Sequence, residues 1–419
     1  MLGIGIVGVR EIAVCGDDIK RRTQVFSSLV TLSVITTLVA SVVYVGTIFA
    51  VPKMHDNLPL MLVGLSRLIF NTLLFEWFFR GIEHFRYISL CSISIKIIYI
   101  ISVFAFVHNS DDCIVYFALT SGTVVLNALV NIVYIRKWVS FSFADIRIKN
   151  YISPILRTGS YMIITSMYTT FNVIYLGIVN TDAEVGYYFA ATKIYTIILG
   201  IYTAFSNVMF PRMSQLIAQH DNKSIKHNLD ISFDILLMFA YPIIAFCIIM
   251  GPELITLLSG DGYEGAIVPM QIIIVLLLVV GICQIIVMQI VIPRNEDNTL
   301  LKASIMGACV GIVCNIIFVK ELGAIGSAIV LLVSEFSVFA FYATYLHKSH
   351  IFDIPYRKIV KHAAVGIPYV IICLGCSVAD VHIVWRLATS AVLCIGYFVV
   401  LHLFILKTPV AYRLIGIER

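Results

Sequence analysis

The most regular feature of the sequence is a series of apolar stretches, each about 20 residues long, separated by short polar connections. An α-helix needs about 20 apolar residues to cross the hydrocarbon core of a bilayer. Backbone groups in lipid must be satisfied within the segment, so such stretches are typical of membrane-spanning helices. The pattern therefore predicts an all-α, polytopic membrane protein with twelve transmembrane helices, at residues 25–50, 58–79, 87–107, 113–135, 158–180, 186–210, 231–252, 266–292, 302–319, 324–346, 361–379 and 383–406.

Composition agrees with this pattern. The 419 residues are 60% hydrophobic and 13% charged, and the mean hydropathy is +0.97. A soluble domain has about 25% charged residues. The net charge of +5 is spread over the connections and forms no basic face, so nucleic acid is not expected as a partner.

The positions of lysine and arginine predict the orientation. Most of the 29 basic residues fall in connections on one side of the twelve spans, and only Lys53, Lys320 and Arg386 fall on the other. Cytoplasmic loops carry the excess of Lys and Arg. We therefore expect a multi-pass protein of the bacterial cytoplasmic (inner) membrane with both termini in the cytoplasm.

Four charged residues lie deep inside predicted spans, well away from the span ends: Arg67, Lys96, Lys193 and Glu335. Charges at this depth are costly and usually face a bundle interior or a water-filled cavity. The three cations are predicted to bind substrate; the alternatives are structural ion pairs or side chains that reach back to the headgroups. Glu335 is predicted to couple transport to an ion, with a counter-ion role as the alternative.

Uncharged polar residues form stripes at helical spacing on three consecutive spans. Asn127 and Asn131 belong to the stripe on the fourth span, Tyr168 and Asn172 to that on the fifth, and Lys193 to that on the sixth. Such stripes also serve helix–helix packing in membranes. Because three neighbouring spans carry them, we expect a shared aqueous cavity whose Asn and Tyr side chains bind sugar hydroxyls.

The second predicted span ends in an unusual segment, FEWFFRGIEHFRYI, at residues 75–88. It predicts a cytoplasmic turn whose aromatic rings lie at the level of the lipid headgroups. Glu76 and Arg80 are four residues apart and can pair if the helix continues.

Part of this segment, EWFFRGIEHFRYI, resembles the EWFFQGIEKFKYI segment of O-antigen (Wzx-type) flippases, in the polysaccharide transporter group of the multidrug/oligosaccharidyl-lipid/polysaccharide (MOP) superfamily. The resemblance continues in order along most of the chain, in GIVGVREIAVCGDDIKRRTQVFSSL (5–29), VGYYFAATKI (185–194), MFPRMSQL (209–216) and MQIVIPRNEDN (288–298). The first of these is similar to the loop that follows the family's second helix. The chain departs from the family at Asn172, where the family often has Asp, so an acidic role at this position does not carry over.

The resemblance implies two helical lobes around a central cavity. Family members carry two further helices ahead of the first matched segment, so we expect an N-terminal lobe at 1–135 that lacks them. A cytoplasmic amphipathic linker at 136–157, a six-span C-terminal lobe at 158–346 and an additional two-helix segment at 347–419 follow.

The implied function is that of a flippase, not an enzyme. It would move undecaprenyl-diphosphate-linked oligosaccharide units by alternating access, without a cofactor, and polymerase and chain-length proteins of the same pathway are possible partners. A multidrug/ion antiporter of the same superfamily is the alternative. An O-antigen polymerase would need a larger external loop than 251–265, and a purely structural scaffold stays open. The sequence has no P-loop, no GxSxG motif and no zinc spacing.

Overall fold

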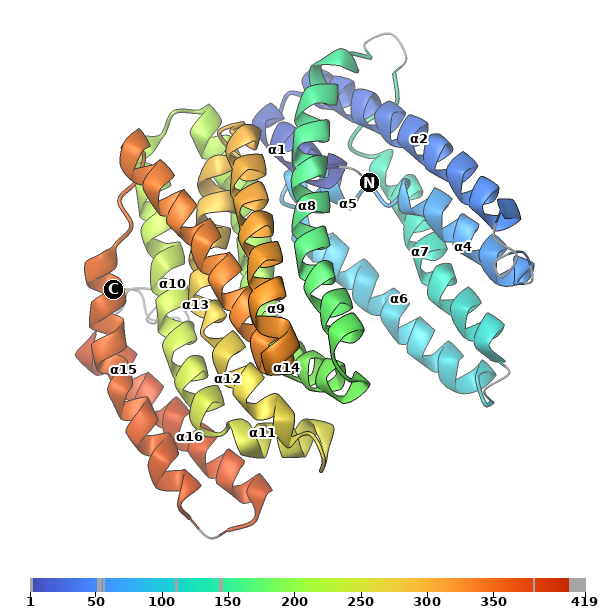
Figure 1. Ribbon diagram of the computed structural model, residues 1–419. Helices are drawn as coiled ribbons and strands as arrows, with labels where there is room; N and C mark the ends of the chain where they lie inside the picture. Colours follow the sequence, from blue (N-terminus) through green and yellow to red (C-terminus); the bar gives the residue numbers. More distant parts are fainter. Residues whose placement is uncertain are drawn as a thin grey trace. The chain divides into compact units, whose positions relative to one another are not determined.

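The computed structural model describes residues 3–50, 55, 57–109, 112–142, 146–379 and 381–406. Every regular element among these residues is a helix (Figure 1), as the hydropathy pattern predicts. The elements are α1 (Ile4–Cys15), α2 (Ile19–Ala50), α4 (Leu58–Asn71), α5 (Glu76–Gly81), α6 (Phe85–Phe106), α7 (Cys113–Ile135), α8 (Lys149–Val179), α9 (Asp182–Ala218), α10 (Asn222–Ile249), α11 (Gly251–Ser259), η2 (Glu264–Ala266), α12 (Ile267–Ile274), α13 (Leu276–Ile286), η3 (Val287–Val291), α14 (Asp297–Ser349), α15 (Tyr356–Ser377), α16 (Ile383–Val400) and η4 (Leu401–Ile405).

Within the described residues, 11 helices are long and apolar enough to cross a membrane. The longest, α14, has 53 residues. A straight helix of that length would measure about 80 Å, far more than the roughly 30 Å of a bilayer core. It is broken at Gly323, where φ is 54° and ψ is −127°. The two parts correspond to the predicted spans at 302–319 and 324–346, so α14 accounts for two of the twelve predicted spans.

The break in α14 makes a tight antiparallel hairpin. Gly326 lies directly against the backbone of Phe318, and Gly311 lies against Ser334, so small residues let the two arms approach closely. Asn180, in the α8–α9 connection, and Glu184, in the first turn of α9, cap the break. The carboxylate of Glu184 accepts the Ala324 N–H at 2.6 Å, and Asn180 donates to backbone carbonyls at the end of the first arm.

The chain packs into two units. Unit 1 comprises Met1–Met162 and Asn207–Gln219, and unit 2 comprises Ile163–Ser206 and His220–Arg419. The long helices α8 and α9 each contribute to both units. Each unit is described separately below.

In unit 1, helix α7 packs against α4 and α6, and the short helix α5 packs against α1. The sequence predicts that the aromatic rings of α5 lie among the lipid headgroups, and the structure instead buries three of them inside unit 1. Trp77, Phe78 and Phe79 are buried, with Trp77 against Gly8 and Phe78 against Phe26 (ring centroids 5.5 Å apart). Hydropathy cannot distinguish a ring that faces headgroups from one that faces protein. The predicted pair does form, since Arg80 Nη2 lies 3.0 Å from Glu76 Oε2.

A second correction concerns residues 5–29, for which the resemblance predicts a loop. They form α1 and the start of α2, joined by a short turn at Gly16–Asp18. Helix α1 is an interior element: Ile4, Val7 and Arg10 are almost fully buried. With 12 residues it is too short to cross a bilayer.

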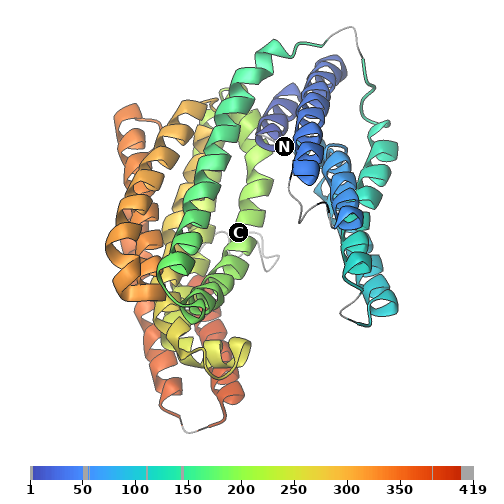
Figure 2. The same cartoon turned by 45° about the vertical axis from the view of Figure 1, so that its right-hand side comes forward.

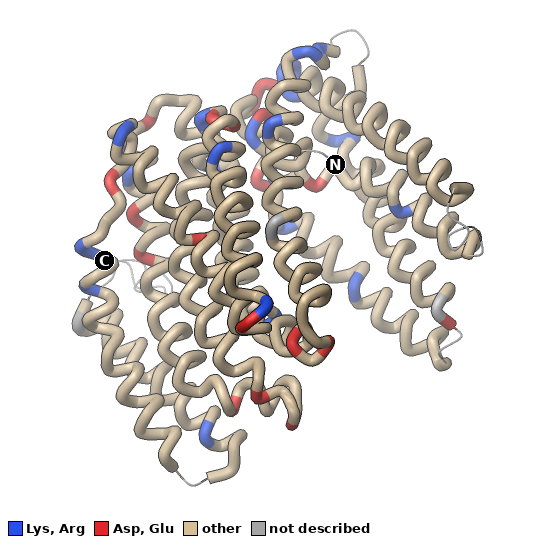
Figure 3. The backbone as a smooth tube through the Cα atoms, viewed as in Figure 1, with Lys and Arg blue, Asp and Glu red and all other residues tan. Residues whose placement is uncertain are grey.

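In unit 2, helix α10 packs against α12, α13 and α15, and α15 runs alongside α16 in both views (Figures 1 and 2). Lys358 of α15 ties this pair to α10, because its Nζ lies 3.2 Å from Asp230 and 3.0 Å from Asp234. Most charged positions of unit 2 gather toward the ends of its helices (Figure 3), as expected for a segment inside a bilayer.

Candidate functional site

A cavity of about 770 Å³ lies in unit 2 between α9 and the end of α11. One face of α9 forms its wall, with Gly186, Ala190, Lys193 and Ile197 spaced three or four residues apart. Tyr263, in the loop after α11, lines the other side. The volume is within the usual range for small-molecule sites, about 300–1,000 Å³.

Lys193 gives this cavity its charge. It is exposed, and its side chain makes no hydrogen bond or ion pair with any residue that the structure describes. Phe189, Ile197 and Leu258 make most of the neighbouring wall apolar. A lysine ammonium with three free donors in a low-dielectric wall attracts anionic groups such as phosphate and repels organic cations.

Glu335 lies away from the cavity lining, on the second arm of α14. It is half-buried and acts electrostatically on Tyr195 of α9 and Cys283 of α13, both buried. The acidic residue therefore belongs to the interface of three helices in unit 2. Glu335 has interaction partners at this interface. This environment agrees with both predicted roles, a counter-ion and a group that takes up a proton.

Asn172 is buried and joins three helices of unit 2. Its Nδ2 donates to the Tyr188 hydroxyl of α9 and to the Ser327 carbonyl of α14, both at 3.0 Å. Its Oδ1 is buried and accepts no hydrogen bond among the described residues. The side chain of Tyr168, predicted on the same stripe, lies outside the described part of the chain.

Two glutamines in the interior of unit 2 are missing from the predicted site residues. Gln284 donates to Thr203 at 3.0 Å, and Gln289 accepts from Ser232 at 2.8 Å. Gln289 is fully buried, and its Nε2 has no partner among the described residues. The π-helical turn Val287–Val291 contains it, and such turns often occur at functional sites. The sequence signal that could have indicated them is the presence of two amide side chains, Gln284 and Gln289, in a very apolar run.

The remaining predicted residues lie in unit 1. Arg67 of α4 and Lys96 of α6 are both exposed, and neither makes a side-chain hydrogen bond or ion pair with a described residue. Two unpaired cations within membrane-length helices need an anionic partner or an aqueous surface. Both are consistent with a role toward an anionic substrate.

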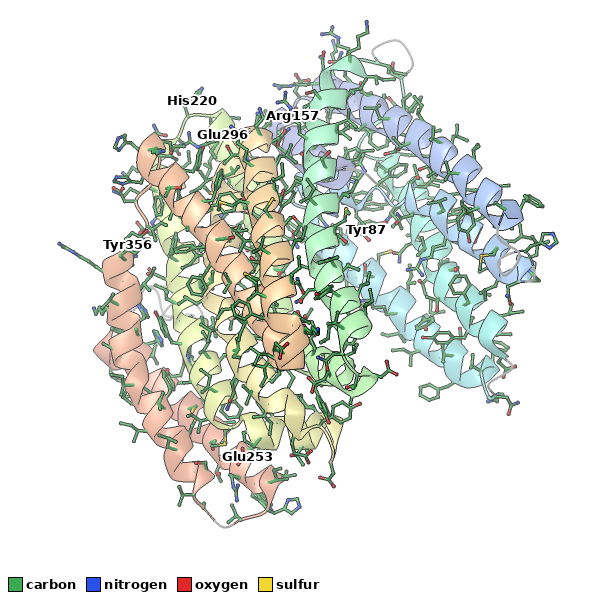
Figure 4. All side chains as sticks on the ribbon, in the orientation of Figure 1. Tyr87, Arg157, His220, Glu253, Glu296 and Tyr356 are labelled. Carbon is green, nitrogen blue, oxygen red and sulfur yellow. The ribbon has the colours of Figure 1, made fainter. Side chains whose placement is uncertain are left out.

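The polar stripe of α7 lies against α6. Thr120 contacts Tyr99, Asn127 accepts from Cys91 Sγ at 3.5 Å, and Asn131 accepts from Tyr87 OH at 2.7 Å. Asn131 is buried and also donates to the Leu74 carbonyl. Tyr87, labelled in Figure 4, stacks on Tyr134 with ring centroids 3.8 Å apart. This stripe therefore holds helices together, whether or not Asn127 also contacts substrate.

The described residues contain no group of three or more His, Cys, Asp or Glu side chains that could hold a metal ion.

Solved structures with a similar fold define the class. The chain has 15% identity and a TM-score of 0.66 to a Vibrio cholerae MATE transporter, covering 84% of this chain and 86% of that one. A MOP superfamily transporter from Pyrococcus furiosus gives 15% identity and a TM-score of 0.70, covering 84% of each chain. Two relatives named "Putative O-antigen transporter" are similar in sequence. The Shigella dysenteriae protein is 24% identical over 65% of this chain and 68% of its own length, and the Escherichia coli K12 protein is 23% identical over 80% and 81%.

The chain therefore has the fold of these MATE and MOP superfamily transporters, and its two sequence relatives are named as transporters. Residues 1–217 match the family of polysaccharide biosynthesis proteins, and the chain belongs to that family.

Proposed function

We propose that the protein moves a lipid-linked oligosaccharide, joined to its undecaprenyl carrier by a diphosphate, across the bacterial cytoplasmic membrane. The observation that carries this proposal is the ammonium of Lys193, which has no partner among the described residues and lies on a cavity with mostly apolar walls. A diphosphate is anionic and is attached to an apolar tail, so a cation set in an apolar wall suits it. The similarity to the two relatives named above supports the same substrate class.

Transport would proceed by alternating access between the two predicted lobes, with the carrier tail in lipid and the head group in the cavity. Arg67 and Lys96 would supply further contacts to the diphosphate, Arg67 through its planar fork. Asn127, Asn131, Tyr168 and Asn172 would contact sugars or position the helices that do. Glu335 would link transport to an ion gradient. Polymerase and chain-length proteins of the pathway are the expected partners.

A multidrug/ion antiporter is the second function to test, because the similar solved structures include MATE transporters. The exposed Lys193 argues against it, since an unpaired cation opposes organic cations. Binding assays with lipid-linked oligosaccharide and with ethidium distinguish the two proposals.

The direct test is binding by the purified protein and its Lys193→Ala variant. One lost charge-assisted hydrogen bond is worth about 1.5–3 kcal/mol, and exposure of the lysine favours the lower end. Affinity for lipid-linked oligosaccharide should therefore fall about tenfold, while Lys193→Arg should retain most of it. Lys302→Ala removes an exposed lysine that does not line the cavity and is the matched control. Equal affinity of Lys193→Ala and wild type would refute the assignment.

We also propose that both termini face the cytoplasm, from the distribution of Lys and Arg. A reporter fused after Arg22 should be active only as a cytoplasmic reporter, and a periplasmic signal would overturn the orientation. The corresponding fusion after Arg419 tests the C-terminus, which lies outside the described residues.

A further inference from the structure

A second cavity, of about 610 Å³, lies in unit 2 and shares no lining residue with the Lys193 cavity. One face of α10 forms a wall, through Asn222, Ile225, Lys226 and Leu229 at helical spacing. The α14–α15 connection, from Ser349 to Pro355, lines the opposite side. Arg294, in the turn between η3 and α14, completes the cavity.

Arg294 is held in a fixed position, and its side chain makes no hydrogen bond or ion pair with a residue that the structure describes. Its backbone N–H bonds to the Ile290 carbonyl, and the preceding residues Val291 and Ile292 are fully buried. The side chain is half-buried, and its Nε is completely shielded without a hydrogen bond among the described residues. Arginine stays ionised in proteins, and a partly buried guanidinium without a partner is costly. The position therefore favours an anionic ligand.

Two further features make the cavity basic. Lys226 is exposed on its wall and has no ion pair among the described residues. Asn222 begins α10, whose N–H groups give this end of the helix a partial positive charge. Asp221 caps that end by accepting from the Ser224 N–H, and these hydrogen bonds lower the pKa of its carboxyl group.

The nearby carboxylates are mostly engaged elsewhere. Asp230 pairs with Lys358 at 3.2 Å, and Glu296 accepts the Tyr345 hydroxyl. Asp353 is the one lining carboxylate without a recorded partner in the described residues, and it opposes an anion. Lys358 is shared between Asp230 and Asp234. The lining therefore carries Lys226 and Arg294 against Asp353 and an Asp230 whose charge Lys358 partly balances.

The cavity is also amphiphilic. Its apolar part is formed by Ile225, Leu229, Ile351 and Phe352, and the Phe352 ring stacks on buried Phe233 with centroids 5.6 Å apart. Glu296 and His220 mark this end of unit 2, and Glu253 lies at the other end (Figure 4). The cavity therefore lies where helices end and the charged loops begin, which is the level of phosphate groups at a bilayer surface.

We propose that this second cavity binds a phosphate group, with Arg294 and Lys226 as its ligands. Two sources carry that group: the headgroup of an anionic phospholipid, or phosphate in solution. The site is separate from the transport cavity, so the proposal does not depend on the transported substrate.

The test uses the purified full-length protein after exchange into lipid-free detergent. One arm adds phosphatidylglycerol, with phosphatidylcholine as the neutral comparison, and counts bound lipids by native mass spectrometry. The other arm titrates inorganic phosphate by calorimetry. Saturable binding in the first arm assigns the site to lipid, and saturable binding in the second assigns it to soluble phosphate. No saturable binding in either arm overturns the proposal.

Variants then locate the site. Arg294→Gln and Lys226→Gln should each weaken binding about tenfold or more, and Asp353→Asn should strengthen it, because it removes the opposing charge. Lys223 is exposed, lies one turn before Lys226 on α10 and does not line the cavity. Lys223→Gln is therefore the matched control and should leave binding unchanged. Lys226 is exposed, so its variant keeps the test valid if Arg294→Gln does not fold. Wild-type affinity in Lys226→Gln, or an equal loss in Lys223→Gln, would contradict the assignment.

Discussion

Replacing Gly323 by alanine tests the hairpin that turns α14 into two membrane passes. At φ 54° and ψ −127° the backbone is in a region that residues with a Cβ rarely adopt, at about 1–3 kcal/mol. An added Cβ would also lie 2.7 Å from the Glu184 carboxyl carbon, so that side chain must move. Its bond to the Ala324 N–H would then be lost, at about 1.5–3 kcal/mol for a charged acceptor.

The net effect follows from these terms. Alanine lowers the entropy of the unfolded chain, which offsets about 0.4–1 kcal/mol. Glu184 is half-exposed, so the lower part of the hydrogen-bond range applies. We expect Gly323→Ala to lower the free energy of unfolding by about 2–4 kcal/mol, as the sum of these contributions. The assay is unfolding by SDS in mixed micelles, followed by far-ultraviolet circular dichroism.

A matched control and a double-mutant cycle separate the causes. Gly396 lies in α16 with no neighbouring atom within 4 Å of a built Cβ, so Gly396→Ala should leave stability equal or slightly higher. Combining Gly323→Ala with Glu184→Ala removes the steric conflict, so the pair should be less destabilised than the sum of the single changes. Wild-type stability of Gly323→Ala would refute the strained turn, and strict additivity would refute the Glu184 contact.

Three other substitutions test separate parts of the structure. Arg67→Ala should abolish or strongly reduce surface polysaccharide in complementation while membrane protein level is retained, with Arg67→Lys intermediate; near-normal polysaccharide would make the arginine structural. Asn172→Leu should lower stability by about 1–3 kcal/mol, since it leaves two polar groups unsatisfied, and an unchanged unfolding midpoint would contradict this. Arg386→Met leaves Glu253, which is 8% exposed, without the guanidinium 2.9 Å away, so we expect a loss of about 2–4 kcal/mol that Glu253→Gln reverses; no recovery in the double variant would show that the loss has another cause.

Much of the fold could be predicted because apolar length is a direct physical requirement for crossing a bilayer. The predicted break near residues 320–323 coincides with Gly323, where polar Lys320 and Glu321 interrupt the apolar run. The interior helix α1 and the burial of Trp77 could not be predicted in the same way. Both depend on contacts with distant segments, such as Trp77 against Gly8, and hydropathy gives the same value for a ring in lipid and a ring in protein.

For the candidate site, too, some features could be predicted from the sequence and others depend on contacts between distant segments. Deep charges can be found from sequence because they are rare in spans, and Lys193 does lie on a cavity. The sequence does not show which helix a polar stripe faces. The stripe with Asn131 lies against α6, where Asn131 accepts a hydrogen bond from the Tyr87 hydroxyl. Gln289 was missed because an uncharged amide in an apolar run carries little signal until its partner Ser232, 57 positions away, is known. The substrate roles of Arg67 and Lys96 stay predictions.

The most direct test of the central proposal is translocation by the purified protein in proteoliposomes. A fluorescent undecaprenyl-diphosphate oligosaccharide is placed in both leaflets, and the fraction accessible to an external quencher is followed over time. The proposal predicts that the protein moves this lipid between leaflets, that Lys193→Ala slows the movement and that Lys302→Ala does not. Lipid movement no faster than in protein-free vesicles, together with ion-driven uptake of ethidium by the same proteoliposomes, would contradict the proposal and identify a multidrug antiporter.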